Sequence, residues 1–120
     1  MIRTFVMVHG FERKWQDCGL DDDGLLELHT SLLLNPIDGE VIVGTHGVRK
    51  MRWALPGKGK SGGIRIFYVD FPHFGILYLL TLLQKNEASN LDKNDRNALG
   101  ELVQSIERAL KKNPKFGEKK

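Results

Sequence analysis

Residues 49–68, RKMRWALPGKGKSGGIRIFY, decide how the rest of this 120-residue chain is interpreted. Two stretches of apolar and basic residues flank the segment PGKGKSGG (56–63), which is too rich in glycine for a helix. The pattern predicts two strands joined by a glycine-rich loop, as in a hairpin. Six cations lie in the stretch: Arg49, Lys50, Arg52, Lys58, Lys60 and Arg65. Cations that converge from a loop and a strand suit a chain of phosphates.

The charge is unevenly distributed along the chain. Residues 1–40 hold eight acidic and three basic residues, whereas residues 41–69 hold six basic residues and no acidic one. Residues 70–120 hold nine basic and seven acidic residues. A local positive field of this kind attracts polyanions such as nucleic acid. A solvated basic surface has the same composition, so charge alone does not decide between the two.

Length and composition predict one domain over residues 1–120, with a frayed tail at 113–120. Cys18 is the only cysteine, which excludes an internal disulfide and is typical of a reducing cytoplasm. The apolar runs are too short for a signal peptide or a membrane span. His29 lies among leucines without a second ligand nearby and is expected to be structural. Near the basic stretch no cluster has metal-ligand spacing, so we expect no metal and no other cofactor.

The apolar patterns predict an α+β domain. Extended segments are predicted at Ile2–Val8, Val41–Val43, Val48–Leu55, Ile64–Phe71 and Ile76–Leu83. Helices are predicted at Phe11–Cys18, from Asp21 to Asn35 and from Asp92 to about Lys111, with the two aspartates as N-caps. We expect the early helices to pack on one face of a small antiparallel sheet, with the continuously apolar Ile76–Leu83 as a central strand.

These features together resemble the RelE superfamily of bacterial toxin–antitoxin systems, and within it the HigB-type toxins. The resemblance spans nearly the whole chain and is most specific from the leucine-rich helix that ends in Asn35-Pro36 onward. Four pieces follow that helix in order: G-x-x-K-x-R (Gly47–Arg52), a glycine-lysine loop (56–63), G-x-R-x-x-Y (Gly63–Tyr68) and an apolar strand ending in Lys-x-Glu (80–87). The resemblance implies a RelE-like small antiparallel sheet, with two N-terminal helices packed on it and a C-terminal helix.

The resemblance also implies an activity and partners. Such toxins are cytoplasmic endoribonucleases that cleave messenger RNA, usually at the ribosomal A site, and a helix-turn-helix antitoxin neutralises them. Metal-free cleavage of RNA uses its own 2′-OH as the nucleophile. The protein must remove that proton, stabilise the phosphorane-like transition state and protonate the leaving 5′-oxygen.

Arg65 is expected to clamp two phosphate oxygens, because its guanidinium is planar and always charged. Lys58, Lys60 and Lys85 are the candidates for proton transfer and further phosphate contacts, since crowded cations can lower the pKa of one lysine. Glu87 is a candidate base or a residue that holds Lys85 in place. Additional RNA contacts are assigned to Arg49, Lys50, Arg52 and Tyr68. Tyr68 and its neighbour Phe67 point in opposite directions on a strand, so only one of them can face the RNA and stack on a base. Some relatives carry a catalytic tyrosine or histidine near the C-terminus, and this chain has neither after Tyr78. The identity of the acid and base therefore stays open, with His46 as a further candidate.

Other functions are compatible with the same pattern. The chain could be a ParE-like gyrase inhibitor or an inactive RNA- or ribosome-binding module of the same fold. A nonspecific nucleic-acid binder is disfavoured by the acidic first 40 residues. The loop lysines can also be solubilising charges, and Tyr68 can equally be a core residue. The combination of the lysine-glycine loop with Arg65 and Lys85 favours the nuclease.

Overall fold

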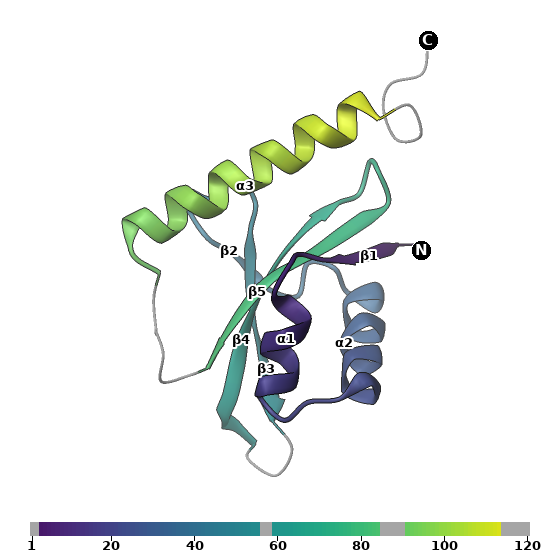
Figure 1. Ribbon diagram of the computed structural model, residues 1–120, viewed down its shortest axis with the longest axis vertical. Coiled ribbons are helices and arrows are strands. Elements are labelled where there is room, and N and C mark those ends of the chain that lie inside the picture. Colours follow the sequence, from purple (N-terminus) through teal and green to yellow (C-terminus); the bar gives the residue numbers. More distant parts are fainter. Residues whose placement is uncertain (1–2, 56–58, 85–90, 114–120) are drawn as a thin grey trace.

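Figure 1 shows the structure, a computed structural model that describes residues 3–55, 59–84 and 91–113, with the backbone alone at 59–62. In these parts of the chain, five strands form one mixed sheet and three helices pack around it. In chain order the elements are β1 (Thr4–Met7), α1 (Phe11–Asp17), α2 (Asp22–Leu34), β2 (Glu40–Val41), β3 (Arg49–Leu55), β4 (Gly59–Phe71), β5 (Ile76–Gln84) and α3 (Lys93–Lys112). The predicted α+β class is confirmed.

The two longer helices begin at the capping residues that the sequence predicts. Asp21 caps α2 by accepting a 2.9 Å hydrogen bond from the Gly24 N–H. Asp92 caps α3 by accepting a 2.8 Å hydrogen bond from the Asp95 N–H. The indole of Trp15, which is buried in α1, donates to the Asp21 carbonyl at 2.8 Å. This bond joins α1 to the start of α2. None of the helices described is long and apolar enough to cross a membrane.

The sheet is not purely antiparallel, and in this respect the sequence prediction is wrong. Its strand order is β1-β5-β4-β3-β2, and the three pairs among β2, β3, β4 and β5 are antiparallel. Strand β1, however, runs parallel to β5, with Thr4 opposite Ile76. The direction of a neighbouring strand depends on how distant segments pair, and apolar residues within one strand do not encode it. The prediction that β5 is a central strand is confirmed, since β1 and β4 flank it.

The predicted hairpin of residues 49–68 is present, but its second strand is longer than expected. Strand β4 begins at Gly59, which pairs with Leu55 of β3 after a register shift that follows Trp53. Most of the predicted loop 56–63 is therefore strand. At Gly63 a Cβ atom would collide with the Trp53 carbonyl, so the close approach of the two strands requires glycine there.

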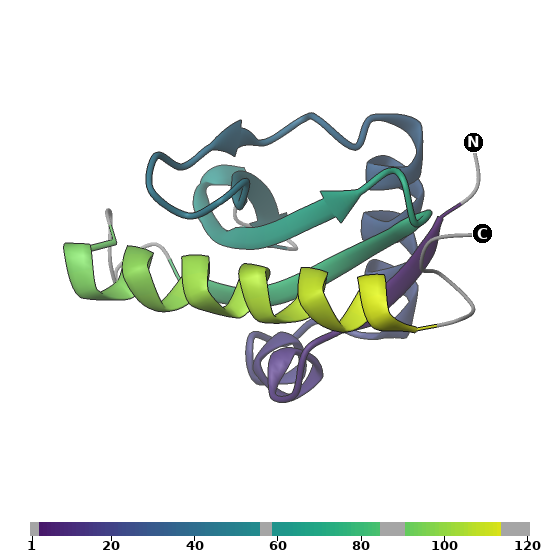
Figure 2. The same cartoon turned by 90° about the horizontal axis from the view of Figure 1, so that it is seen from above.

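The strongly twisted sheet, across which α3 runs, has two buried faces (Figure 2). The α1/α2 face buries the apolar residues Phe11, Trp15, Leu28, Leu32, Met51, Ile64, Ile66, Tyr68, Leu77 and Leu79. The α3 face buries Val48, Phe67, Val69, Phe71, Ile76, Leu80, Val103 and Leu110. Because side chains alternate along β4, its even-numbered residues from 64 to 68 contact the early helices. Its odd-numbered residues, Arg65 among them, face the other way.

Candidate functional site

A groove of about 730 Å³ lies along the outer strands of the sheet. Its walls are formed by residues Asp38, Glu40, Lys50, Met51, Arg52, Ala54 and Arg65. In the sheet, Arg52 lies opposite Arg65, and Glu40 lies opposite Lys50. Residues directly opposite each other in an antiparallel pair share a face, so the register of three strands gathers these four charged side chains at one place.

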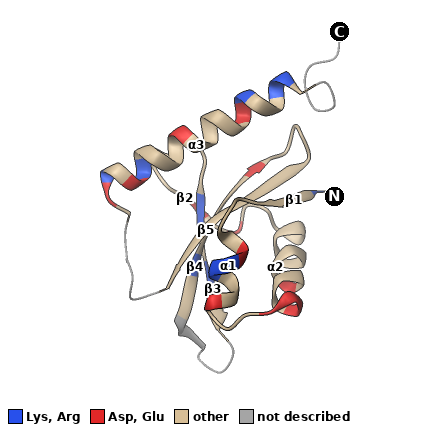
Figure 3. Ribbon diagram, in the orientation of Figure 1, with Lys and Arg blue, Asp and Glu red and all other residues tan. Residues whose placement is uncertain are grey.

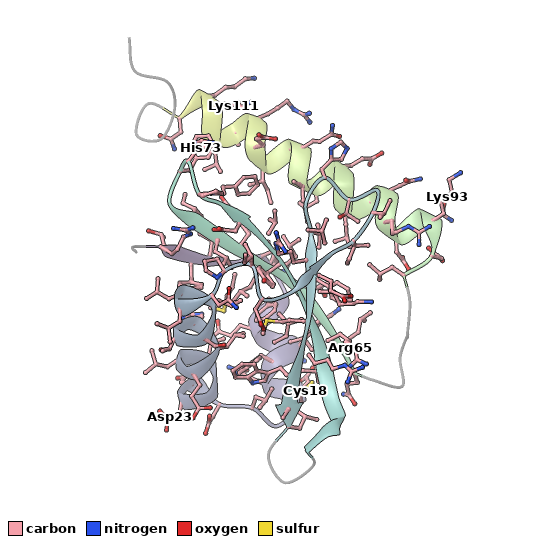
Figure 4. The ribbon with its side chains drawn as sticks, turned by 180° about the vertical axis from the view of Figure 1, so that it is seen from behind. Cys18, Asp23, Arg65, His73, Lys93 and Lys111 are labelled. Carbon is pink, nitrogen blue, oxygen red and sulfur yellow. The ribbon has the colours of Figure 1, made fainter. Side chains whose placement is uncertain are left out.

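Arg65 is the most informative residue of the groove. Its strand neighbours Ile64 and Ile66 are fully buried on the α1/α2 face, so Arg65 lies on the opposite face. Figure 4 shows it on the side of the sheet away from α2. Its Nη1 atom is buried and has no hydrogen-bond partner among the described residues. A buried donor left unsatisfied typically costs about 1–3 kcal/mol, and more when it is charged.

Another buried arginine shows the usual arrangement. The Arg3 side chain is 5% exposed and binds Asp70 with two hydrogen bonds, from Nε at 2.7 Å and from Nη2 at 3.0 Å. The hydrogen bonds to this carboxylate raise the pKa of Arg3. Arg65 has no such carboxylate among the described residues. Arg65 also lines the groove, where an anion could contact its side chain.

Two further cations stand beside Arg65. Arg52 is exposed and Lys50 is half-buried, and neither side chain forms an ion pair within the described part of the chain. Figure 3 shows basic residues on β3 and β4 and acidic residues at the start of α2. Like charges directly opposite in a sheet repel each other, so a bound anion would stabilise the Arg52–Arg65 pair.

Arg49 was expected at the RNA-binding surface, and the structure places it elsewhere. It lies opposite Tyr68 in the sheet and therefore faces away from Lys50 and Arg52. Its Nη1 donates to the Gly39 carbonyl at 2.7 Å and to the Ile37 carbonyl at 3.5 Å. Arg49 holds the segment before β2 to the sheet.

Tyr68 is also part of the structure rather than of the groove, because it has no exposed surface. Its hydroxyl donates to the Pro36 carbonyl at 2.8 Å and accepts from the Gly39 N–H at 2.9 Å. Burial raises the pKa of Tyr68, despite the opposing effect of the Gly39 hydrogen bond. Phe67 is buried too, at 2% exposure. Neither aromatic ring is available to stack on a base.

Tyr68 and Arg49 together fix residues 36–39, the segment that leads into β2. A Cβ atom at Gly39 would lie 2.8 Å from the Lys50 carbonyl, so this segment lies tightly against β3. Asp38 and Glu40 are thereby held at the groove. Sequence reasoning missed these two carboxylates, because only the pairing of β2 with β3 brings them beside the basic residues.

The remaining predicted residues are not gathered with Arg65 in the structure as described. Lys58, Lys85 and Glu87 lie outside the described residues, as does most of the tail, and Lys60 belongs to β4 without a described side chain. His46 lines a separate pocket of about 240 Å³ together with His73 and Glu107. It is therefore not a neighbour of Arg65.

His29 is partly buried, as expected. Its ring stacks on Phe5 of β1 with a centroid distance of 4.5 Å. Its Nε2 atom is buried without a hydrogen-bond partner among the described residues, and burial lowers the pKa of His29. In the described ranges no three His, Cys, Asp or Glu residues are grouped so that they could hold a metal ion.

The groove thus combines a half-buried arginine whose Nη1 has no partner among the described residues, two more cations and two carboxylates. No protein-family model matches this chain. The chemistry of the groove is therefore the basis on which a function can be assigned.

Proposed function

We propose that this chain is a metal-independent endoribonuclease that cleaves messenger RNA on the ribosome. In this proposal it is the toxin of a type II toxin–antitoxin module, of the HigB type within the RelE superfamily. Its partners are the ribosomal A site and a helix-turn-helix antitoxin in the cytoplasm. The assignment to this family is supported by the motifs within residues 35–87, which resemble those of the HigB-type toxins. The α+β architecture is compatible with that family.

The observation that carries the proposal is the groove position of Arg65, whose Nη1 has no partner among the described residues, beside two further cations. Arg65 lines the groove, so a phosphate there can form charge-assisted hydrogen bonds with its guanidinium, whose fork can contact two phosphate oxygens at once. Arg52 and Lys50 would then contact the phosphates that flank the scissile one. A single-stranded RNA backbone carries a phosphate at every nucleotide, so its row of negative charges matches the row of cations in the groove.

In the reaction, the ribose 2′-OH attacks the adjacent phosphorus and the bond from phosphorus to the 5′-oxygen breaks. Arg65 stabilises the negative charge that builds up on the equatorial oxygens. A base takes the 2′ proton and an acid gives a proton to the leaving 5′-oxygen. The candidates for these two steps remain Lys58, Lys60, Lys85 and Glu87. The products carry a 2′,3′-cyclic phosphate and a 5′-hydroxyl.

Transcript mapping tests the proposal. Cells expressing the chain should contain cleaved transcripts whose ends, mapped by primer extension, fall within translated codons. A messenger whose start codon has been removed should stay intact. The downstream fragments should accept a phosphate from polynucleotide kinase without prior phosphatase treatment, because they carry a 5′-hydroxyl.

Two results would contradict the proposal. One is growth arrest without transcript cleavage, as expected of a gyrase inhibitor. The other is a 5′-phosphate on the fragments, which requires water and not the 2′-OH as the nucleophile. In the same cells, Arg65→Ala should abolish cleavage. Arg13→Ala is the matched control for expression of that variant, because it removes an exposed arginine of α1 outside the groove.

A further inference from the structure

The groove has an acidic wall opposite its cations. Asp38 and Glu40 are exposed, line the groove, and carry carboxylates with no hydrogen bond or ion pair to any described residue. Glu40 lies directly opposite Lys50 in the sheet, where an ion pair would be easy to form, yet the two side chains form none. Both carboxylates are therefore free to accept hydrogen bonds from a ligand.

This wall is fixed in position by the core. The Tyr68 hydroxyl binds both Pro36 and Gly39, and Arg49 binds the Gly39 carbonyl. Gly39 in turn lies too close to the Lys50 backbone for any larger residue. These contacts fix the backbone of residues 36–39, so the two carboxylates stay at the groove although their side chains are exposed and unpaired among the described residues.

The two sides of the groove attract different parts of an RNA strand. Arg52 and Arg65 attract phosphates, whereas Glu40 repels them and attracts N–H donors. A single-stranded RNA in the groove therefore has its backbone along the cations and a base directed at the carboxylates. Unpaired bases present their Watson–Crick edges for hydrogen bonding of this kind. Guanine alone among the four bases presents two adjacent N–H donors there, from N1 and N2, which match the two oxygens of one carboxylate.

We propose that Glu40 is a specificity-determining residue that recognises a guanine next to the phosphate held by Arg65. The proposal rests on the RNA-cleaving function proposed above and specifies its substrate. Glu40 has this role because its strand position opposite Lys50 directs it into the groove. Asp38 precedes the strand and contributes negative charge to the wall.

Binding of short RNAs tests this proposal without relying on cleavage. Fluorescein-labelled pentamers of sequence UUNUU, with each of the four bases at the centre, are titrated with the full chain at low salt, and anisotropy is measured. The guanine pentamer should bind about tenfold more tightly than the other three, as a bidentate contact to a base implies. Glu40→Gln should bring the guanine affinity to within about twofold of the others, because an amide offers only one acceptor.

Asp38→Asn is the matched control, since it removes the same charge from the same groove. It should strengthen binding of all four pentamers alike and keep the preference for guanine. Glu27→Gln, on α2, should change neither quantity. Equal binding of the four RNAs by the wild-type chain would overturn guanine recognition. Guanine recognition by Glu40 would also be overturned if Glu40→Gln bound all four RNAs more tightly by the same factor. The same holds if the preference for guanine were lost in Asp38→Asn and kept in Glu40→Gln. If Arg65-dependent transcript cleavage persists in these cases, the proposed function stands and only the role of Glu40 is lost.

Discussion

The two faces of the β3–β4 hairpin differ in whether their buried polar side chains have hydrogen-bond partners among the described residues. On the α1/α2 face, the Tyr68 hydroxyl both donates and accepts a hydrogen bond, and Arg49 donates to the backbone. On the groove face, Arg65 keeps a buried N–H donor without a partner among the described residues. Satisfied polar groups hold the fold together, while an unsatisfied one destabilises it until a ligand binds. His29 of α2, on the α1/α2 face, also has a buried nitrogen without a partner among the described residues, but a histidine can be neutral whereas a guanidinium stays charged. Within the hairpin, the difference favours the groove face as the one that binds a ligand.

The largest expected effect on stability comes from the α1/α2 face. Leu28 is fully buried there, so Leu28→Ala should lower the free energy of unfolding by about 2–5 kcal/mol. Leu26, on the same helix but 65% exposed, is the matched control, and Leu26→Ala should cost less than about 0.5 kcal/mol. Urea denaturation of the two variants measures both values. Equal losses would mean that this face is not the core of the domain.

A smaller effect is expected from Tyr68→Phe, which keeps the ring but removes the hydroxyl. The Pro36 carbonyl and the Gly39 N–H then lose their partner, at a cost of about 1–3 kcal/mol. Hydrogen exchange of the Gly39 amide should become faster as well. Tyr78→Phe is the control, because Tyr78 is half-buried and makes no hydrogen bond to another described residue. Unchanged exchange at Gly39 would show that Tyr68 does not fix the acidic wall.

On the groove face, charge removal should change binding rather than stability. The double variant Lys50→Ala, Arg52→Ala should alter the free energy of unfolding by less than about 1 kcal/mol. The slope of log affinity for single-stranded RNA against log salt should fall by about 0.7 for each phosphate that the variant no longer neutralises. The double variant Arg13→Ala, Lys14→Ala on α1 removes the same charge and should leave the slope unchanged. If the salt dependence of affinity were weaker in this control and unchanged in the Lys50→Ala, Arg52→Ala variant, the RNA would bind on the α1/α2 face.

The smallest effect concerns the pH dependence of stability on the α1/α2 face. Burial lowers the pKa of His29 below its ordinary value of about 6.5. Above that pH the ring is neutral in both the folded and the unfolded chain, so its protonation does not change the free energy of unfolding. As the pH falls below about 6.5, the unfolded chain takes up the proton first, so stability decreases.

His29→Phe keeps the ring stacked on Phe5 and removes this titration. The melting temperature of the variant should therefore fall less than that of the wild type between about pH 7.5 and pH 5.5. The other histidines are the same in both proteins and cancel in the comparison. An identical pH dependence would mean that His29 accepts its proton equally well in the folded state.

Features that depend on neighbouring residues were predictable from the sequence. The caps at Asp21 and Asp92 each depend on residues within one turn, and the central position of β5 follows from its unbroken apolar character. An arginine between two isoleucines also predicts a side chain that faces a site or a partner, because its burial is otherwise costly. The structure gives Arg65 that position.

Features that depend on pairing were not predictable. Nothing within residues 1–10 encodes that β1 runs parallel to a strand more than 60 positions later. Arg49 and Lys50 are adjacent and alike in charge, yet they face opposite sides of the sheet. Tyr68 could face either way from its sequence context alone. The carboxylates of Asp38 and Glu40 reach the groove only because the edge strand β2 pairs with β3.

The most direct test of the account compares the stability of Arg65 variants with their rate of cleavage on programmed ribosomes. Arg65→Ala should cleave about 10²–10³-fold more slowly, because the transition state then lacks one donor. Arg65→Lys should recover only part of the rate, since an ammonium group cannot bind two phosphate oxygens at once. Both variants should unfold at the same urea concentration as the wild type or a higher one, because the buried Nη1 that they remove has no partner among the described residues. Full cleavage by a well-folded Arg65→Ala variant, or a loss of activity matched by a loss of stability, would contradict the account.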